Sequence, residues 1–152
     1  MLEAVEQLPL AQFLRRDIYA YPLVNALHVL SLGVLVTTAL LMDFRVLGLG
    51  KKVALDATIE TLRPLAIGAL LAAALTGFLL FSVQPDNYAG NPVFITKLVL
   101  IGLALANAGF FVFGRWYAAP HTHKARLSAA LSILLWIAVL LAGRAIAFFG
   151  GD

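Results

Sequence analysis

The sequence predicts an all-α integral membrane protein, a four-helix bundle, and two observations support this prediction. Hydrophobic residues make up 62% of the 152 residues and charged residues 12%, whereas soluble domains are about one quarter charged. Four apolar stretches each reach the length of about 20 residues that a helix needs to cross a bilayer. Because backbone polar groups in lipid must be bonded within their own segment, each stretch is expected to be a helix. We therefore expect one membrane domain over residues 1–152.

The first element expected is a short interfacial helix within residues 1–17. Leu10, Phe13 and Leu14 fall at helical spacing, and Arg15 and Arg16 stand beside them. An apolar face next to basic residues is typical of a helix that lies in the membrane interface. This helix is expected to lead into the first span.

The four spans are expected at about residues 19–42, 64–83, 93–113 and 127–149. Ahead of the second span, charged residues recur at i, i+4 and i+7, opposite apolar ones: Asp56, Glu60 and Arg63. This periodicity predicts that the second helix begins in water and continues into the membrane. The connection before the third span is rich in turn residues, with Asn91 placed to cap the next helix and Pro92 to begin it.

The distribution of basic residues predicts the orientation of the bundle. Seven of the eleven Lys and Arg residues lie in or beside the first and third connections: Arg45, Lys51, Lys52, Arg63, Arg115, Lys124 and Arg126. By the positive-inside rule, both termini lie on the outer side, which for a bacterial inner membrane is the periplasm. Aromatic belts agree, with Tyr19, Tyr21 and Tyr88 outside and with Trp116 and Tyr117 inside. The net charge of +3 thus belongs to membrane orientation, and no nucleic-acid-binding surface is expected.

The polar residues inside the spans are predicted to gather in the outer leaflet. His28 lies about nine residues, or roughly 13 Å, below the start of the first span. Asn25 shares a helix face with His28, and we expect this face to turn toward the bundle interior. The other three spans contribute Thr76, Lys97 and Arg144. An ionisable residue inside a membrane is a candidate functional site by default.

This constellation predicts a b-type haem. His28 would supply an axial imidazole, Lys97 and Arg144 would neutralise the propionates, and Asn25 and Thr76 would complete the site. Small residues would let the ring approach the helices: Gly33, Gly77, Gly102 and Ala104. The chain has no cysteine, so the haem would be bound non-covalently, and thiolate metal sites and iron–sulfur clusters are excluded. Since no other histidine lies in a span, the sixth position would be vacant or filled by Lys97, water or a partner's residue.

Four motifs also carry a family resemblance: Leu27-His28-Val-Leu-Ser-Leu-Gly33, Leu41-Met-Asp43-Phe-Arg45-Val-Leu-Gly48, Pro92-Val-Phe-Ile-Thr-Lys97-Leu and Ala142-Gly-Arg144. Over nearly the whole chain they resemble an uncharacterised bacterial family of four-helix integral membrane proteins, classed as a domain of unknown function. More distantly, the chain is similar to HemJ-type protoporphyrinogen oxidases and CopD-like membrane haem proteins. That similarity implies that His28 matches the haem ligand and Lys97 the essential lysine. Asn107 stands near the place of a further HemJ-type histidine, so neither porphyrinogen oxidation nor a bis-histidine haem is expected.

Each polar feature also has a purely structural interpretation. A lone intramembrane histidine can simply bond to a neighbouring helix. Lys97 and Arg144 can snorkel toward lipid head groups. Asn107 is expected to join two helices. An ion pair or a helix-end anchor is favoured for Asp43 and Arg45 over a role in proton transfer.

Three function classes follow. The leading one is a haem protein that passes electrons between a quinone or outer donor and a redox partner subunit, because one haem cannot span the roughly 30 Å hydrocarbon core. The alternative is a cofactor-free anchor or structural subunit, within a homo-oligomer or a larger complex. A small transporter is disfavoured, because no polar path continues into the inner half. The sequence does not decide whether the protein is an enzyme.

Overall fold

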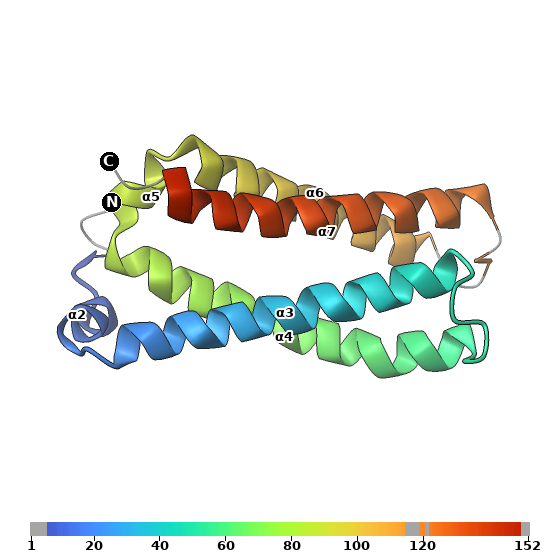
Figure 1. Cartoon of the computed structure of the whole chain (residues 1–152), viewed down its shortest axis with the longest axis horizontal. Coiled ribbons are helices and arrows are strands. Elements are labelled where there is room, and N and C mark those ends of the chain that lie inside the picture. Colours follow the sequence, from blue (N-terminus) through green and yellow to red (C-terminus); the bar gives the residue numbers. More distant parts are fainter. Residues whose placement is uncertain (1–5, 115–118, 121, 150–152) are drawn as a thin grey trace.

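The computed structural model describes residues 6–114, 119–120 and 122–149, and over these residues the secondary structure is helical, without strands. Figure 1 shows the long helices packed lengthwise, with a short helix across one end. The elements are α2 (Pro9–Arg16), α3 (Ala20–Val46), α4 (Leu55–Val83), α5 (Pro85–Ala89), α6 (Pro92–Phe113) and α7 (His123–Phe149). We call the end that carries α2 the α2 end, and the end where α3 joins α4 the opposite end.

Four of these helices are long and apolar enough to cross a membrane: Ala20–Val46, Leu55–Val83, Pro92–Phe113 and His123–Ile146. Large apolar side chains are exposed along all four of them. Such surfaces are costly in water and are satisfied by lipid. The arrangement is compatible with a multi-pass membrane helical bundle, as the sequence predicts.

The helix boundaries refine the predicted spans. α4 begins at Leu55, which confirms that the second helix extends well beyond its apolar segment. α3 continues to Val46, and α7 begins at His123. Part of the predicted interfacial helix, residues 1–5, lies outside the described residues, as do Arg115, Trp116 and Tyr117 of the orientation and belt arguments.

The long helices form two hairpins, α3 with α4 and α6 with α7, and α3 packs on α7 to join them. Figure 1 shows α3 close to α7 toward the opposite end and farther from it toward the α2 end. Small residues at helical spacing on α4 let α3 approach closely: Ala66, Ala69, Ala73 and Thr76 are all buried. The main core includes Leu35 and Val36 of α3 with Trp136 and Val139 of α7.

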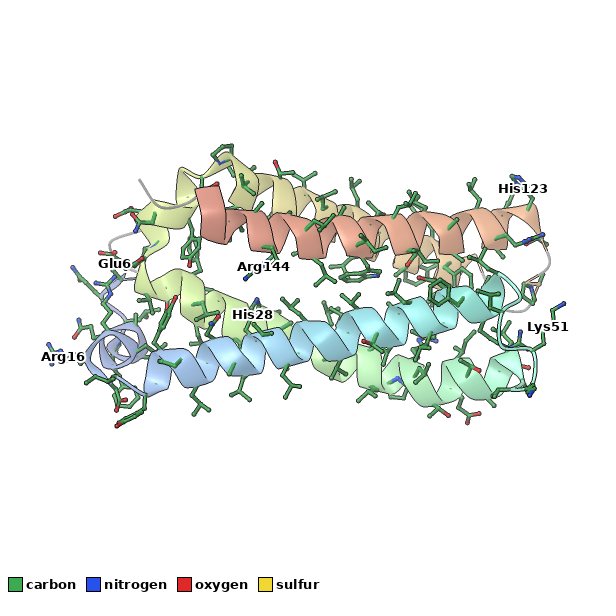
Figure 2. All side chains as sticks on the ribbon, in the orientation of Figure 1. Glu6, Arg16, His28, Lys51, His123 and Arg144 are labelled. Carbon is green, nitrogen blue, oxygen red and sulfur yellow. The ribbon has the colours of Figure 1, made fainter. Side chains whose placement is uncertain are left out.

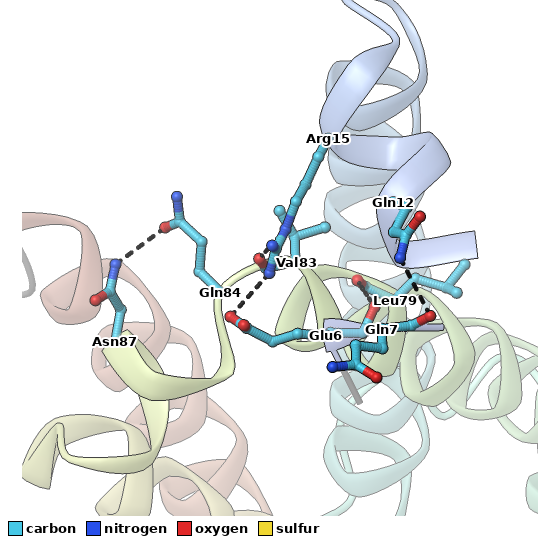
Figure 3. A network of polar contacts seen from close by, with 9 residues as sticks. Glu6, Gln7, Gln12, Arg15, Leu79, Val83, Gln84 and Asn87 are labelled. Atoms are coloured by element: carbon cyan, nitrogen blue, oxygen red, sulfur yellow. Dashed lines mark hydrogen bonds and ion pairs between the residues drawn. The ribbon is translucent and has the colours of Figure 1, made fainter. Parts of the chain in front are cut away.

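The α2 helix is attached to the end of α4 by Arg15. Its Nε donates to the Val83 carbonyl oxygen at 2.7 Å, and its Nη2 forms an ion pair of 2.8 Å with Glu6. Figure 3 shows both contacts. Because the last carbonyls of a helix lack partners within it, a cation at this position both satisfies a buried acceptor and offsets the helix dipole.

The short connection from α4 to α6 contains the single-turn helix α5. The Asn91 side chain accepts hydrogen bonds from the backbone N–H groups of Val93 at 2.8 Å and Phe94 at 3.4 Å. Pro92 is the first residue of α6. The predicted cap and helix start are thus confirmed.

Candidate functional site

The side chain of His28 is bonded across the α3–α4 hairpin. Its Nδ1 lies 2.9 Å from Oγ1 of Thr76. His28 is half-buried, and Thr76 is buried. Two of the predicted site residues are therefore brought together directly, on adjacent helices.

The contacts of Thr76 determine which imidazole nitrogen carries the proton. The Thr76 hydroxyl donates its single hydrogen to the backbone carbonyl of Ala72 at 2.6 Å, with the Ala73 carbonyl at 3.3 Å. Oγ1 can then only accept from His28, so Nδ1 is the protonated nitrogen. The Ala73 carbonyl is a further acceptor beside the ring. In the neutral imidazole, Nε2 is left with the free lone pair that a metal ligand needs.

The imidazole of His28 packs against α4 at Gly77. A Cβ atom at residue 77 would lie 3.0 Å from Cε1 of His28 and 3.6 Å from Nδ1. This is tighter than nine in ten real Cβ contacts, so a methyl group there would push the ring away by a few tenths of an ångström. The predicted role of Gly77 as a point of close approach is thus supported, but the flat group that it accommodates is the histidine itself.

The basic residues lie on the facing hairpin. Lys97 of α6 lies across Gly143 of α7, where a Cβ atom would be 3.6 Å from Nζ. Lys97 and His28 are close enough to interact electrostatically. Figure 2 shows the side chains of His28 and Arg144 directed from α3 and α7 into the region between the hairpins. One imidazole on one hairpin thus faces two cations on the other.

Other residues predicted for the site are not brought to His28. Asn25 is exposed, and the structure gives its side chain no hydrogen bond within the described residues. A Cβ atom at Gly33 or Gly102 would meet open space, so neither glycine contacts a helix there. Ala104 is 1% exposed and belongs to the core. Sequence reasoning also missed Gly143, whose small size leaves room for Lys97.

An aromatic cluster lies at the α2 end of the bundle. The rings of Phe81 and Phe94 stack at 5.6 Å with an angle of 8°, and the Tyr88 ring centroid lies 5.4 Å from that of Phe94. Tyr88 also forms a hydrogen bond with Tyr21 of α3. Burial raises the pKa of the Tyr88 phenol, and Tyr21 raises this pKa further. Two of the three tyrosines predicted for the outer belt, Tyr21 and Tyr88, therefore tie α5 to α3.

A second group of polar contacts lies toward the opposite end. Asn107 Nδ2 donates to the Ser128 carbonyl at 3.0 Å, and Ser128 Oγ donates to Asn107 Oδ1 at 3.0 Å. This pair joins α6 to α7, as expected of Asn107. Asp43 and Arg45 do not pair with one another: Asp43 bonds to Ser132, whereas Arg45 Nε donates to the Val53 carbonyl at 2.7 Å. The sequence favoured either an ion pair or a helix-end anchor for these two residues. The ion pair is wrong, whereas Arg45 does anchor the end of α3.

A site made by protein ligands alone is not found in the part of the chain that the structure describes, since no three His, Cys, Asp or Glu residues gather there. A haem needs only one such ligand, so this finding bears on bare metal ions. In comparisons with protein-family models, curated proteins and solved structures, nothing matches the chain. The family resemblance and the functions that it implies therefore stay predictions.

Proposed function

We propose that the protein binds one b-type haem non-covalently between its two hairpins at the α2 end, and that it transfers electrons there. The observation that carries the proposal is the hydrogen bond from Nδ1 of His28 to Thr76, which leaves the lone pair of Nε2 available to bind a metal. Histidines that bind metals usually donate their other N–H to a protein acceptor, which fixes the tautomer and the ring orientation. Thr76 and the Ala73 carbonyl play this part on α4.

The basic residues near His28 also fit a haem. A haem carries two propionates, which need cations or hydrogen-bond donors. Lys97 and Arg144, on the hairpin that faces His28, supply both kinds of group. A bound haem supplies one-electron redox chemistry. The chain's own residues would hold the haem, orient the imidazole of His28 and neutralise the haem propionates.

The location suggests how such a protein would work. We assign the α2 end to the outer, periplasmic side of a bacterial inner membrane, from the distribution of Lys and Arg. One haem in that leaflet cannot carry electrons across the roughly 30 Å core. A quinone or a redox partner subunit must therefore exchange electrons with it on the same side.

Measurement of the bound haem tests the proposal. The protein, purified from membranes of haem-replete cells, is expected to show a Soret band that shifts on reduction with dithionite. His28→Ala should remove the band, and His123→Ala, an exposed histidine at the start of α7, should keep it. A colourless wild-type protein, or equal haem content in His28→Ala, would refute the proposal.

One observation favours a second function, a cofactor-free anchor or structural subunit. The His28 side chain already has a partner, and its bond to Thr76 alone would lock α3 to α4. In that case haem would be absent, and His28→Ala would lower the stability of the hairpin without changing any spectrum. The same preparation decides between the two functions.

A further inference from the structure

Asp43 occupies an unusual position for a carboxyl group. It lies one turn before the end of α3, between Ala39 and Val46, which are both buried. Ala39 belongs to the core that includes Trp136 of α7, and Val46 packs with Ala125 and Ala129 at the start of α7. The carboxyl group is therefore set into the contact between α3 and α7, which joins the two hairpins.

Its two oxygens have different surroundings. The carboxyl group forms one hydrogen bond, with the hydroxyl of Ser132 on α7. Oδ2 is inaccessible to solvent and has no hydrogen-bond partner among the described residues. A buried carboxylate in an apolar interface normally requires a cation or several donors. Here a single hydroxyl is present.

Among the described residues, the nearby polar groups supply neither a cation nor a further hydrogen-bond donor to Asp43. Arg45 is directed to the Val53 carbonyl. Asn107 and Ser128 satisfy one another. The titratable and charged residues of this half of α4 and α7 have exposed side chains: Asp56, Glu60, Arg63, His123, Lys124 and Arg126. Within the described residues, the ion pair formed is that of Arg15 with Glu6, at the other end of the molecule.

We propose that Asp43 is a proton-binding site, with its carboxyl group held in the neutral, protonated form between α3 and α7. The proton comes from the aqueous phase at the opposite end and forms an O–H bond with the oxygen that faces Ser132. That O–H donates to the Ser132 hydroxyl, which can accept as well as donate. Oδ2 is then a neutral carbonyl oxygen, and its missing partner costs far less than a missing counter-charge.

This site is independent of the haem proposal. It lies in the other half of α3 from His28, and none of its contacts involves His28, Lys97 or Arg144. Release of the proton would place a negative charge in the interface that holds the hairpins together. Protonation of Asp43 is therefore coupled to the packing of α3 on α7.

Infrared spectroscopy of the whole protein in lipid at neutral pH tests the proposal. The wild type is expected to show the carbonyl stretching band of one protonated carboxyl group per chain. Asp43→Asn, which keeps the shape of the neutral acid, should lose this band, and Asp56→Asn, at an exposed carboxylate of α4, should keep it. A wild-type spectrum with carboxylate bands only, or a band that persists in Asp43→Asn, overturns the proposal.

A second variant covers the case in which Asp43→Asn does not fold. Ser132→Ala removes the one hydrogen bond to the carboxyl group and leaves the proton in place. The band should then shift to the higher frequency of a carboxyl group without a hydrogen bond. An unshifted band in a folded Ser132→Ala protein would contradict its assignment to Asp43.

Discussion

Replacement of Thr76 by Val separates the structural role of the His28–Thr76 bond from its role in holding a ligand. Valine has nearly the shape of threonine, so the packing of residue 76 against α3 is kept and the hydroxyl is lost. The bond of 2.9 Å joins α3 to α4. Hydrogen bonds between membrane helices contribute about 0.6 kcal/mol on average, so the loss of stability should be of that order.

The effect on haem should be larger than the effect on stability. Without Oγ1, the imidazole keeps only the Ala73 carbonyl as a nearby acceptor, and the ring is free to change its tautomer and to rotate. Loss of such a supporting contact typically lowers the affinity for a metal by about 10- to 100-fold. That is roughly 1.4 to 2.8 kcal/mol, two to five times the cost in stability.

Haem titration and thermal unfolding of the same preparations measure both quantities. Thr37→Val is the matched control, because Thr37 is an exposed threonine on α3, away from His28. We expect it to leave both quantities unchanged. If Thr76→Val bound haem as tightly as the wild type, the argument that Thr76 orients His28 would be wrong. If affinity and stability fell by the same free energy, the bond would be structural only.

Three further outcomes follow from the geometry. Gly77→Ala places a methyl carbon 3.0 Å from Cε1 of His28 and should weaken haem binding several-fold by displacing the ring, which a haem titration would reveal. Asn107→Leu breaks two hydrogen bonds with Ser128 and should lower the stability by about 1 kcal/mol in thermal unfolding, with haem content unchanged. Because the pKa of Tyr88 is raised in the folded state, the unfolded chain loses this proton first as the pH rises above about 10, and stability should fall there. Tyr88→Phe should make the unfolding temperature less dependent on pH in this range; an unchanged dependence would argue against the buried phenol.

The sequence predicted the helices well because their signals are local. Apolar length indicates the spans, the spacing of Asp56 and Glu60 indicates the extension of α4, and Asn91 with Pro92 marks the start of α6. Each of these features depends on neighbours along the chain. The membrane class follows from composition alone.

The candidate site was predicted only in part, because it depends on how the helices are rotated and paired. His28 and Thr76 meet because both face the α3–α4 contact, whereas Asn25, on the predicted interior face of α3, is exposed. The space that Gly143 leaves for Lys97 depends on the pairing of α6 with α7. The burial of Asp43 likewise follows from the packing of α3 on α7, which the sequence around Asp43 does not encode.

The most direct test of the central claim is electron paramagnetic resonance of the oxidised protein with isotopically labelled histidine. If Nε2 of His28 is the axial ligand, the iron signal should show a hyperfine coupling that changes with the label, and His28→Ala should abolish that coupling. A haem signal that is insensitive to the label would mean that another group binds the iron. If protein from haem-replete membranes gave no haem signal, the central claim would be wrong, and His28 would serve only to bond α3 to α4.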